Sequence, residues 1–215
     1  MKRLLMATVA VCGMALLAGA DVPGTFKPDG DGFIQDWLVL EPIRLQNLQQ
    51  TNEGGRAVIE HEYFKDQLTV MPKAGETVTV EGAAYQWHAV KAKDYIVDLT
   101  GFAAANQKPV LSELFWGVVY LQSPEEYKEI RLAIGSDDSS VWWLNGQEVI
   151  HAFGVRQTST DDNVSKRITL KKGMNVLRFA VIQGDGPADC CARFIDARQK
   201  PITGLTVMLV PPAEK

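Results

Sequence analysis

The chain has 215 residues, of which 46% are hydrophobic and 22% are charged, and its formal net charge is −4. These values are typical of a folded globular protein, and they exclude a disordered tail, a collagen-like rod and a multi-span membrane protein. The negative charge also argues against nucleic acid as a partner, because nucleic-acid binding needs a dense positive surface.

The first twenty residues have the pattern of a secretory signal peptide. Lys2 and Arg3 form a basic start, an apolar run covers residues 4–17, and small residues precede Asp21. We expect residues 1–20 to be removed after Ala20, which predicts a secreted or periplasmic protein without a transmembrane anchor. An uncleaved anchor helix is the alternative, but the apolar run is short for a bilayer span.

Residues 21–68 combine patterns of loop, strand and helix. Residues 21–32 are rich in Pro, Gly and Asp, which predicts an exposed lead-in to a single domain over residues 33–212. The apolar run after Phe33 predicts a buried strand that ends at Pro42. Apolar residues at helical spacing predict a short helix near residues 56–64.

From Thr69 onward the pattern is that of short strands. β-branched and aromatic runs alternate with turn residues, and no long helix lies between them. This pattern predicts an all-β fold, an antiparallel β-sandwich of the jelly-roll type. Asn145-Gly146 is a strong hairpin signal, and Lys171 to Gly173 indicates a second tight turn.

The positions of these two hairpins predict where the loops in the second half of the chain lie. If consecutive strands run antiparallel, both hairpins lie at one end of the sandwich. The loops of residues 135–139, 154–165 and 184–189 then meet at the other end. Loops gathered on a rigid sandwich are common binding sites, so we expect the functional site there.

The side chains of these loops are mainly acidic. The candidate ligand-binding residues on them are Asp137, Asp138, Arg156, Asp162, Asp185 and Asp189. Carboxylates accept hydrogen bonds from sugar hydroxyls, and an arginine fork donates several. The alternatives are that the aspartates cap their own turns and that Arg156 forms an ion pair with one of them.

Tryptophans supply the aromatic candidates. Trp142 and Trp143 are adjacent on a predicted strand, so they face opposite sides of it. Trp142 is expected in the core, together with Trp37, Trp87 and Trp116. Trp143 is the seventh candidate for ligand binding, because an exposed indole offers a face for sugar rings. The favoured alternative is a second packing layer, because tryptophan is highly buried on average.

Metal binding has weaker signals. Asp29 and Asp31 have the spacing of a calcium loop, and Asp138 and Asp161 are acidic loop residues, so a structural Ca²⁺ is compatible with these four positions. The three histidines are far apart and show no metal spacing. Cys190 and Cys191 are adjacent, which predicts two thiols with at least one buried in a strand, or else a strained vicinal disulfide.

Several of these motifs are similar to those of a known family. "YKEIRLAIGSDDSSVWWLNGQEVI", "ITLKKGMNVLRFAVIQGDG" and "ARFIDARQKPITGL" resemble the galactose-binding-like β-sandwich that accompanies bacterial glycoside hydrolases of the β-galactosidase type. The Asp-Asp and Asn-Gly pieces also resemble the protective-antigen-type adhesin domain, another sandwich. The resemblance implies a β-sandwich in which many members bind carbohydrate.

Two functions follow as hypotheses. The first is a secreted, non-catalytic module that binds a polysaccharide or glycan through the loop end. The second is a structural or protein-interaction module with an envelope protein as partner, which predicts an exposed apolar patch including Trp143. A glycosidase or polysaccharide lyase is a minor alternative, because no catalytic motif is present.

Overall fold

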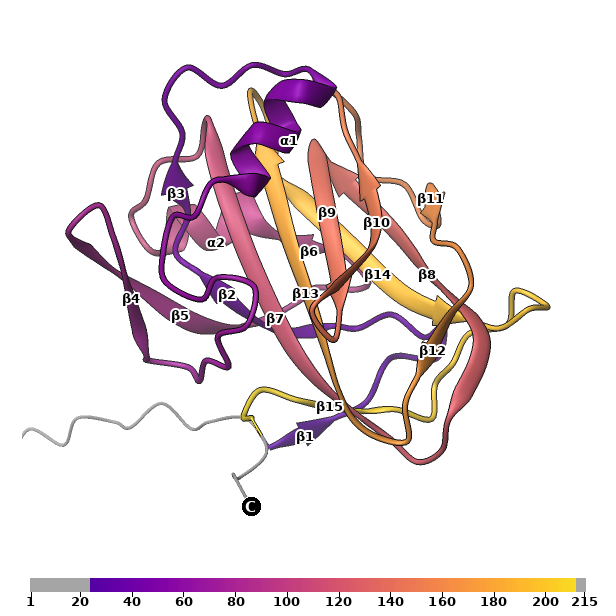
Figure 1. Ribbon diagram of the computed structural model, residues 1–215. Helices are drawn as coiled ribbons and strands as arrows, with labels where there is room; N and C mark the ends of the chain where they lie inside the picture. The colour runs from indigo at the N-terminus through magenta and orange to yellow at the C-terminus, as the bar shows by residue number, and fades with distance from the viewer. Residues whose placement is uncertain (1–23, 212–215) are drawn as a thin grey trace, which may run out of the picture.

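The computed structural model describes residues 24–211 of the chain (Figure 1). The predicted signal peptide lies outside these residues. Within them, the chain forms two antiparallel sheets and two short helices, α1 (Asn52–Glu60) and α2 (Leu99–Ala105). The predicted all-β class is therefore confirmed. No helix in this part of the chain is long and apolar enough to cross a membrane.

The larger sheet has ten strands and forms the centre of the molecule. Its strands are β1 (Thr25–Phe26), β2 (Asp36–Leu40), β3 (Ile43–Arg44), β4 (Thr77–Val80), β5 (Ala83–Lys91), β7 (Glu113–Ser123), β9 (Ser139–Leu144), β10 (Gln147–Ala152), β13 (Gly173–Gln183) and β15 (Thr206–Met208). The main order is β10-β9-β13-β7-β2-β5-β4. The segment expected as an exposed lead-in thus supplies β1, which pairs with β15.

The smaller sheet has five strands and packs against one face of the larger sheet. Its strands are β6 (Val97–Asp98), β8 (Tyr127–Asp137), β11 (Asn163–Val164), β12 (Ile168–Leu170) and β14 (Asp189–Ile195). The main order is β11-β8-β14-β6, with β12 also paired to β8. The chain crosses from the smaller to the larger sheet at Asp138, and it returns through residues 184–188.

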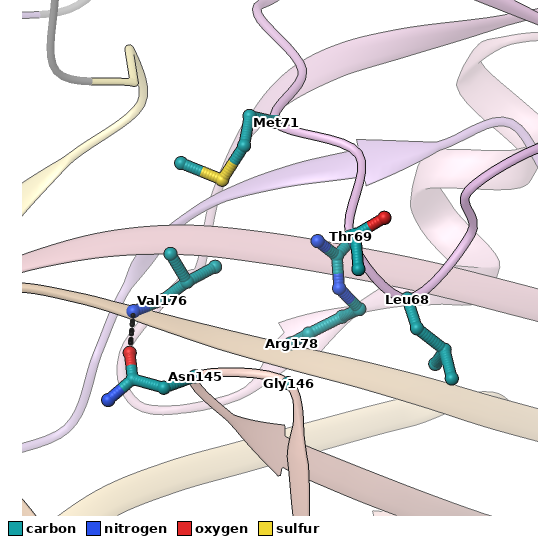
Figure 2. Close-up of a pocket in the computed structure, with 7 residues that line it drawn as sticks. All are labelled: Leu68, Thr69, Met71, Asn145, Gly146, Val176 and Arg178. Atoms are coloured by element: carbon teal, nitrogen blue, oxygen red, sulfur yellow. Dashed lines mark hydrogen bonds between the residues drawn. The ribbon is translucent and has the colours of Figure 1, made fainter. Parts of the chain in front are cut away.

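The predicted hairpin at Asn145-Gly146 is confirmed. Both residues have positive φ, 52° and 80°, as the turn requires. The Asn145 side chain fixes the turn to the next strand, because its Oδ1 accepts a hydrogen bond from the Val176 N–H at 2.9 Å (Figure 2). Its Nδ2 donates to Asn175 Oδ1 at 3.0 Å, which brings this hairpin close to the one before Gly173.

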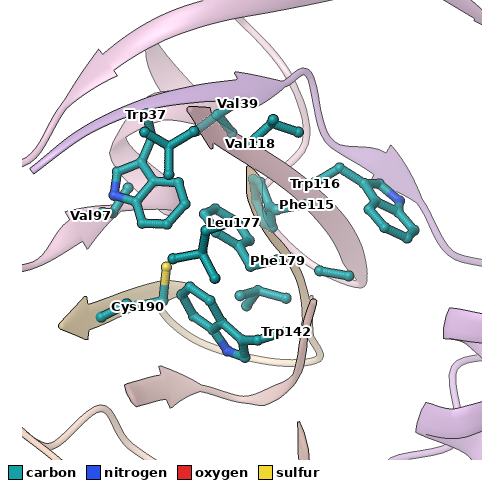
Figure 3. Packing of buried hydrophobic residues seen from close by; sticks show 14 of the residues in the cluster. Trp37, Val39, Val97, Phe115, Trp116, Val118, Trp142, Leu177, Phe179 and Cys190 are labelled. Atoms are coloured by element: carbon teal, nitrogen blue, oxygen red, sulfur yellow. The ribbon is translucent and has the colours of Figure 1, made fainter. Parts of the chain in front are cut away.

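Aromatic side chains fill the space between the two sheets (Figure 3). Trp37, Trp142 and Phe179 project from the larger sheet with ring centroids 5.1–5.9 Å apart. Cys190 faces them from the smaller sheet and is fully buried. Trp37, Trp87, Trp116 and Trp142 are at most 1% exposed, so their prediction as core residues is confirmed.

The chain between β3 and β4 covers the outer face of the larger sheet. Phe64 from this segment packs edge-on against Trp116, with centroids 6.0 Å apart. Trp116 in turn stacks on Trp143 at 5.5 Å. The core therefore has a second apolar layer on this side of the sheet, beyond the layer between the sheets.

The helices differ in how well the sequence predicted them. The helix expected near residues 56–64 is present as α1 but begins and ends four residues earlier, with Thr51 capping its first turn. The strand pattern predicted from Thr69 onward includes residues 95–102, but residues 99–102 belong to α2, so the prediction was wrong there. Asp98 ends β6 and caps α2, because its Oδ1 accepts a hydrogen bond from the Gly101 N–H at 2.7 Å.

Candidate functional site

The three loops predicted to meet do lie together, and Asp138 joins them. Its Oδ1 accepts a hydrogen bond from the Arg156 N–H, and its Oδ2 accepts one from the Gly184 N–H, each at 3.1 Å. Asp138 itself is only 5% exposed. Both of its oxygens are therefore occupied by backbone donors, which gives Asp138 a structural role in holding the site together.

Arg156 and Asp162 form an ion pair within the same region. Arg156 Nε is buried and has no hydrogen-bond partner within residues 24–211. Asp185 follows Gly184 and is exposed. We call Asp137, Asp138, Arg156, Asp162, Asp185 and Asp189 the loop cluster.

Three aspartates lie side by side at the ends of neighbouring strands of the smaller sheet, beside the loop cluster. Asp189 is directly opposite Asp137 on one neighbouring strand and directly opposite Asp98 on the other. Opposed residues point to the same face of a sheet. Because Cys190 points into the core, this face is the outer one. We call Asp98, Asp189 and Asp137 the acid row.

Two members of the acid row, Asp137 and Asp189, have raised pKa values. Burial, followed by the charges of Asp138 and Asp189, raises the pKa of Asp137 to about 6. Burial also raises the pKa of Asp189, and the charge of Asp98 adds to that increase. Asp189 Oδ1 is buried and has no hydrogen-bond partner among residues 24–211. Carboxyl groups are thus placed next to one another, and no ion pair within residues 24–211 compensates Asp137 or Asp189.

The loop of residues 154–165 lies over this face. Thr158 Oγ1 donates a hydrogen bond of 3.3 Å to the Asp189 carbonyl oxygen. The loop also comes so close to Gly135 that a Cβ there would lie 2.2 Å from the Ser159 carbonyl oxygen. Gly135 is therefore needed for this loop to rest on the sheet.

The opposite side of Asp138 is closed by the segment before α1. Gln49 and Gln50 line a small cavity next to Asp138, of about 10 Å³. A cavity of this size holds about one water molecule. On the outer face of the smaller sheet, by contrast, Asp98 and Asp185 are exposed.

Two of the sequence predictions need correction here. Trp143 is 5% exposed and stacks on Trp116, so it belongs to the second packing layer and presents no face to a ligand. The four metal candidates do not form one site, and no group of three or more His, Cys, Asp or Glu side chains in the described part of the chain could hold a metal ion.

The oxygens of the metal candidates have other partners. Asp29 Oδ1 accepts hydrogen bonds from the Asp31 and Phe33 N–H groups, at 3.0 and 2.8 Å. Arg193 connects two other candidates, because it pairs with the Asp161 carboxylate and donates a hydrogen bond to the Asp31 carbonyl oxygen.

The cysteines are free thiols, as one of the two interpretations predicted. Cys190 and Cys191 are both buried in β14. Burial raises the pKa of Cys191 to about 11, so this thiol is protonated at neutral pH.

Sequence reasoning missed Asp98 as part of the site. A signal was present, since Asp98 is a residue type that caps helices and a run of three alanines, residues 103–105, follows Phe102. The apolar run around it favoured the strand interpretation.

Comparison of the sequence with protein-family models gives no match, and neither does comparison with curated proteins. Among solved structures, the chain is similar to the PA14 domain of the MpAFP antifreeze protein, with 10% identity and a TM-score of 0.48 over 82% of this chain and 93% of that one. It is also similar to a PA14 sugar-binding domain from an RTX adhesin, with 13% identity and a TM-score of 0.43 over 80% and 96% of the two chains.

A third similar structure is the A domain of epithelial adhesin 9 from Candida glabrata in complex with Galb1-4GlcNAc, with 11% identity and a TM-score of 0.45 over 87% and 94% of the two chains. These three structures are PA14 or adhesin domains and not galactose-binding-like domains of β-galactosidases. The β-sandwich assignment itself rests on the strand order and register of this chain.

Proposed function

We propose that this chain is a non-catalytic carbohydrate-binding module that acts outside the cytoplasm and binds neutral glycans at the acid row and the loop cluster. The observation that supports the proposal best is the acid row itself. Like charges opposed across strands cost stability, so a fold gains nothing from them in the absence of a ligand. Such local costs are typical of functional sites.

The chemistry of the row limits what can bind. Ionised carboxylates only accept hydrogen bonds, so the ligand has to supply donors or positive charge. Asp138, Asp161 and Asp162 already have partners. Oδ1 of Asp98 also caps α2, so the row offers a ligand Asp137, Asp189 and the second oxygen of Asp98. Sugar hydroxyls are suitable donors, whereas the carboxylates of the acid row repel an anionic polymer.

The loop of residues 154–165 lies over Asp189, so it has to move before a ligand can contact Asp189 Oδ1. The exposed Asp98 and Asp185 are where a glycan first makes contact. Thr158 contacts Asp189 through a hydrogen bond of 3.3 Å to its carbonyl oxygen, while other residues of the loop are fixed at Asp138 and Arg193. In this proposal the loop yields at Thr158, and a sugar hydroxyl then donates to the buried oxygen of Asp189.

The alternative of a protein-interaction module has less support. It predicts an exposed apolar patch that includes Trp143, and Trp143 is buried. The large apolar side chains that are exposed in the described part of the chain are Leu68, Met71, Tyr95, Leu111, Val155 and Val164. Leu68 and Met71 share one segment, Val155 and Val164 both belong to residues 154–165, and Tyr95 and Leu111 lie on other segments.

The test is binding of the purified chain to a glycan array and to polysaccharide affinity gels, with Ca²⁺ and again with a chelator. Asp98→Asn is the sharpest variant, because asparagine caps a helix as well as aspartate does and only the charge is lost. Asp189→Asn removes the acceptor at the centre of the row. Asp66→Asn, on the segment between α1 and β4, is the matched control.

We expect retention on a neutral glycan and a loss of about tenfold or more for both row variants, since a hydrogen bond to a charged group contributes about 1.5–3 kcal/mol. Retention that survives the chelator indicates direct binding, and retention lost with the chelator indicates an ion between the carboxylates and the sugar. No retention on any glycan under either condition would overturn the proposal.

A further inference from the structure

An apolar pocket lies on the outer face of the larger sheet, at the end of β9 opposite to the loop cluster (Figure 2). It has a volume of about 250 Å³. Leu68 and Met71 border it from the segment that covers the sheet, and Val176 borders it from β13. The Asn145-Gly146 turn closes another side.

Arg178 is the charged residue among the described residues that line this pocket, and it is 2% exposed. Its Nη2 donates a hydrogen bond to the Val70 carbonyl oxygen at 2.6 Å. Its Nη1 is buried and finds no partner within residues 24–211. The guanidinium therefore has an unused donor in an apolar environment.

No carboxylate in the described part of the chain forms an ion pair with Arg178. Its neighbours across the sheet are Trp143 on β9 and Val118 on β7, and neither carries a charge. Burial lowers the pKa of Arg178 to about 10, so the side chain remains a cation at neutral pH. A buried charge without a counter-ion is costly, which makes this position favourable for a bound anion.

The residues that line the pocket around Arg178 favour one class of anion. The pocket offers a single cation and mostly apolar walls, which cannot replace the hydration of a phosphate or sulfate. A guanidinium matches the two oxygens of a carboxylate, and Leu68, Met71 and Val176 can contact an apolar tail. At roughly 30 Å³ for each water-sized group, the volume corresponds to about eight non-hydrogen atoms.

We propose that this pocket binds a small monocarboxylate with an apolar tail, with the carboxylate at Arg178 and the tail along Val176 and Met71. The proposal does not depend on glycan binding, because the pocket and the acid row lie at opposite ends of β9. Each can fail without affecting the other.

The experiment uses the full chain, labelled with ¹⁵N and titrated with sodium hexanoate, which has eight non-hydrogen atoms. We expect saturable shifts of the Asn145, Gly146 and Val176 amide signals. The uncharged 1-hexanol has the same tail, and we expect it to bind at least about tenfold more weakly, because it cannot pair with the guanidinium.

Three variants separate binding from stability. Val176→Phe fills the pocket with a residue that strands favour, and we expect hexanoate binding to be lost. Val164→Phe makes the same change on exposed β11 and should leave binding unchanged. Arg178→Gln, where it folds, should reduce hexanoate affinity to that of hexanol.

Three results would overturn the proposal. They are the absence of saturable shifts with hexanoate, equal affinities for hexanoate and hexanol, and unchanged hexanoate binding in Val176→Phe. If Arg178→Gln does not fold, the comparison of hexanoate with hexanol on the wild-type chain still decides the role of the charge.

Discussion

Asp137 and Asp189 lie directly opposite each other on β8 and β14, and neither forms an ion pair within residues 24–211. The two carboxylates repel each other on a face that the loop of residues 154–165 covers. The arrangement costs stability in the free protein, and it supplies hydrogen-bond acceptors to a ligand.

The first prediction concerns this repulsion. Asp189→Asn should raise the free energy of unfolding by up to about 1 kcal/mol at pH 7.5, because it removes one of two opposed charges. The same variant should bind glycan less well, so stability and binding change in opposite directions. Urea unfolding measures the first effect. A variant that is both less stable and unchanged in binding contradicts the assignment.

Asp138 should behave differently from Asp189, because it holds two loops together. Asp138→Ala removes the acceptor for the Arg156 and Gly184 N–H groups and should cost about 2–4 kcal/mol of stability. Amide hydrogen exchange at these two residues should become much faster. If their exchange is unchanged while the global stability falls, the carboxylate does not have this role.

Glu113 should make stability depend on pH. It is fully buried, neither of its carboxylate oxygens has a partner among the described residues, and burial raises its pKa to about 7. Between pH 4.5 and pH 7 the folded state holds a proton that the unfolded state releases. The contribution of Glu113 to stability therefore falls as the pH rises through this range, and the loss is complete above it.

Glu113→Gln should remove this dependence and stabilise the protein at pH 8 by roughly 3 kcal/mol. The measurement is the free energy of unfolding at several pH values between 4 and 8, with Glu62→Gln on the surface as the control. Asp137 contributes a similar slope up to about pH 6, so the difference between variant and wild type is the relevant quantity. Parallel curves for the two proteins would show that Glu113 does not titrate in this way.

Trp143 tests whether the outer layer of the larger sheet is structural. Trp143→Ala should cost about 3–5 kcal/mol, since it leaves a cavity beside Trp116. Val155→Ala, at a side chain that is 72% exposed, should have almost no effect. If Trp143→Ala keeps its stability and loses glycan affinity, the tryptophan is a ligand contact after all.

The fold and the gathering of the loops could be predicted because they depend on local signals. Asn145-Gly146 requires a tight turn, and strand reversal at each such turn places residues 135–139, 154–165 and 184–189 at one end. The partners of the aspartates could not be predicted. Whether Asp161 meets Arg193 or a metal depends on strand order across the smaller sheet, which no local pattern specifies.

The outer layer and the Arg178 pocket were missed for a related reason. Alternation along β9 shows that Trp142 and Trp143 face opposite sides, but it does not show that the segment between β3 and β4 returns to cover one side. Arg178 sits among apolar strand residues in the sequence, and its burial follows only from that cover. The outer layer and the pocket both depend on contacts between segments that are distant in the sequence, and local patterns do not reveal such contacts.

The most direct test of the central claim is an NMR titration of the ¹⁵N-labelled chain with the neutral glycan that it retains best, at pH 7.5. The account predicts that the amide signals of Asp98, Asp137 and Asp189 shift together and saturate, while those of Asn145 and Val176 stay in place. Saturable shifts confined to other parts of the surface, with the acid row unchanged, would contradict it.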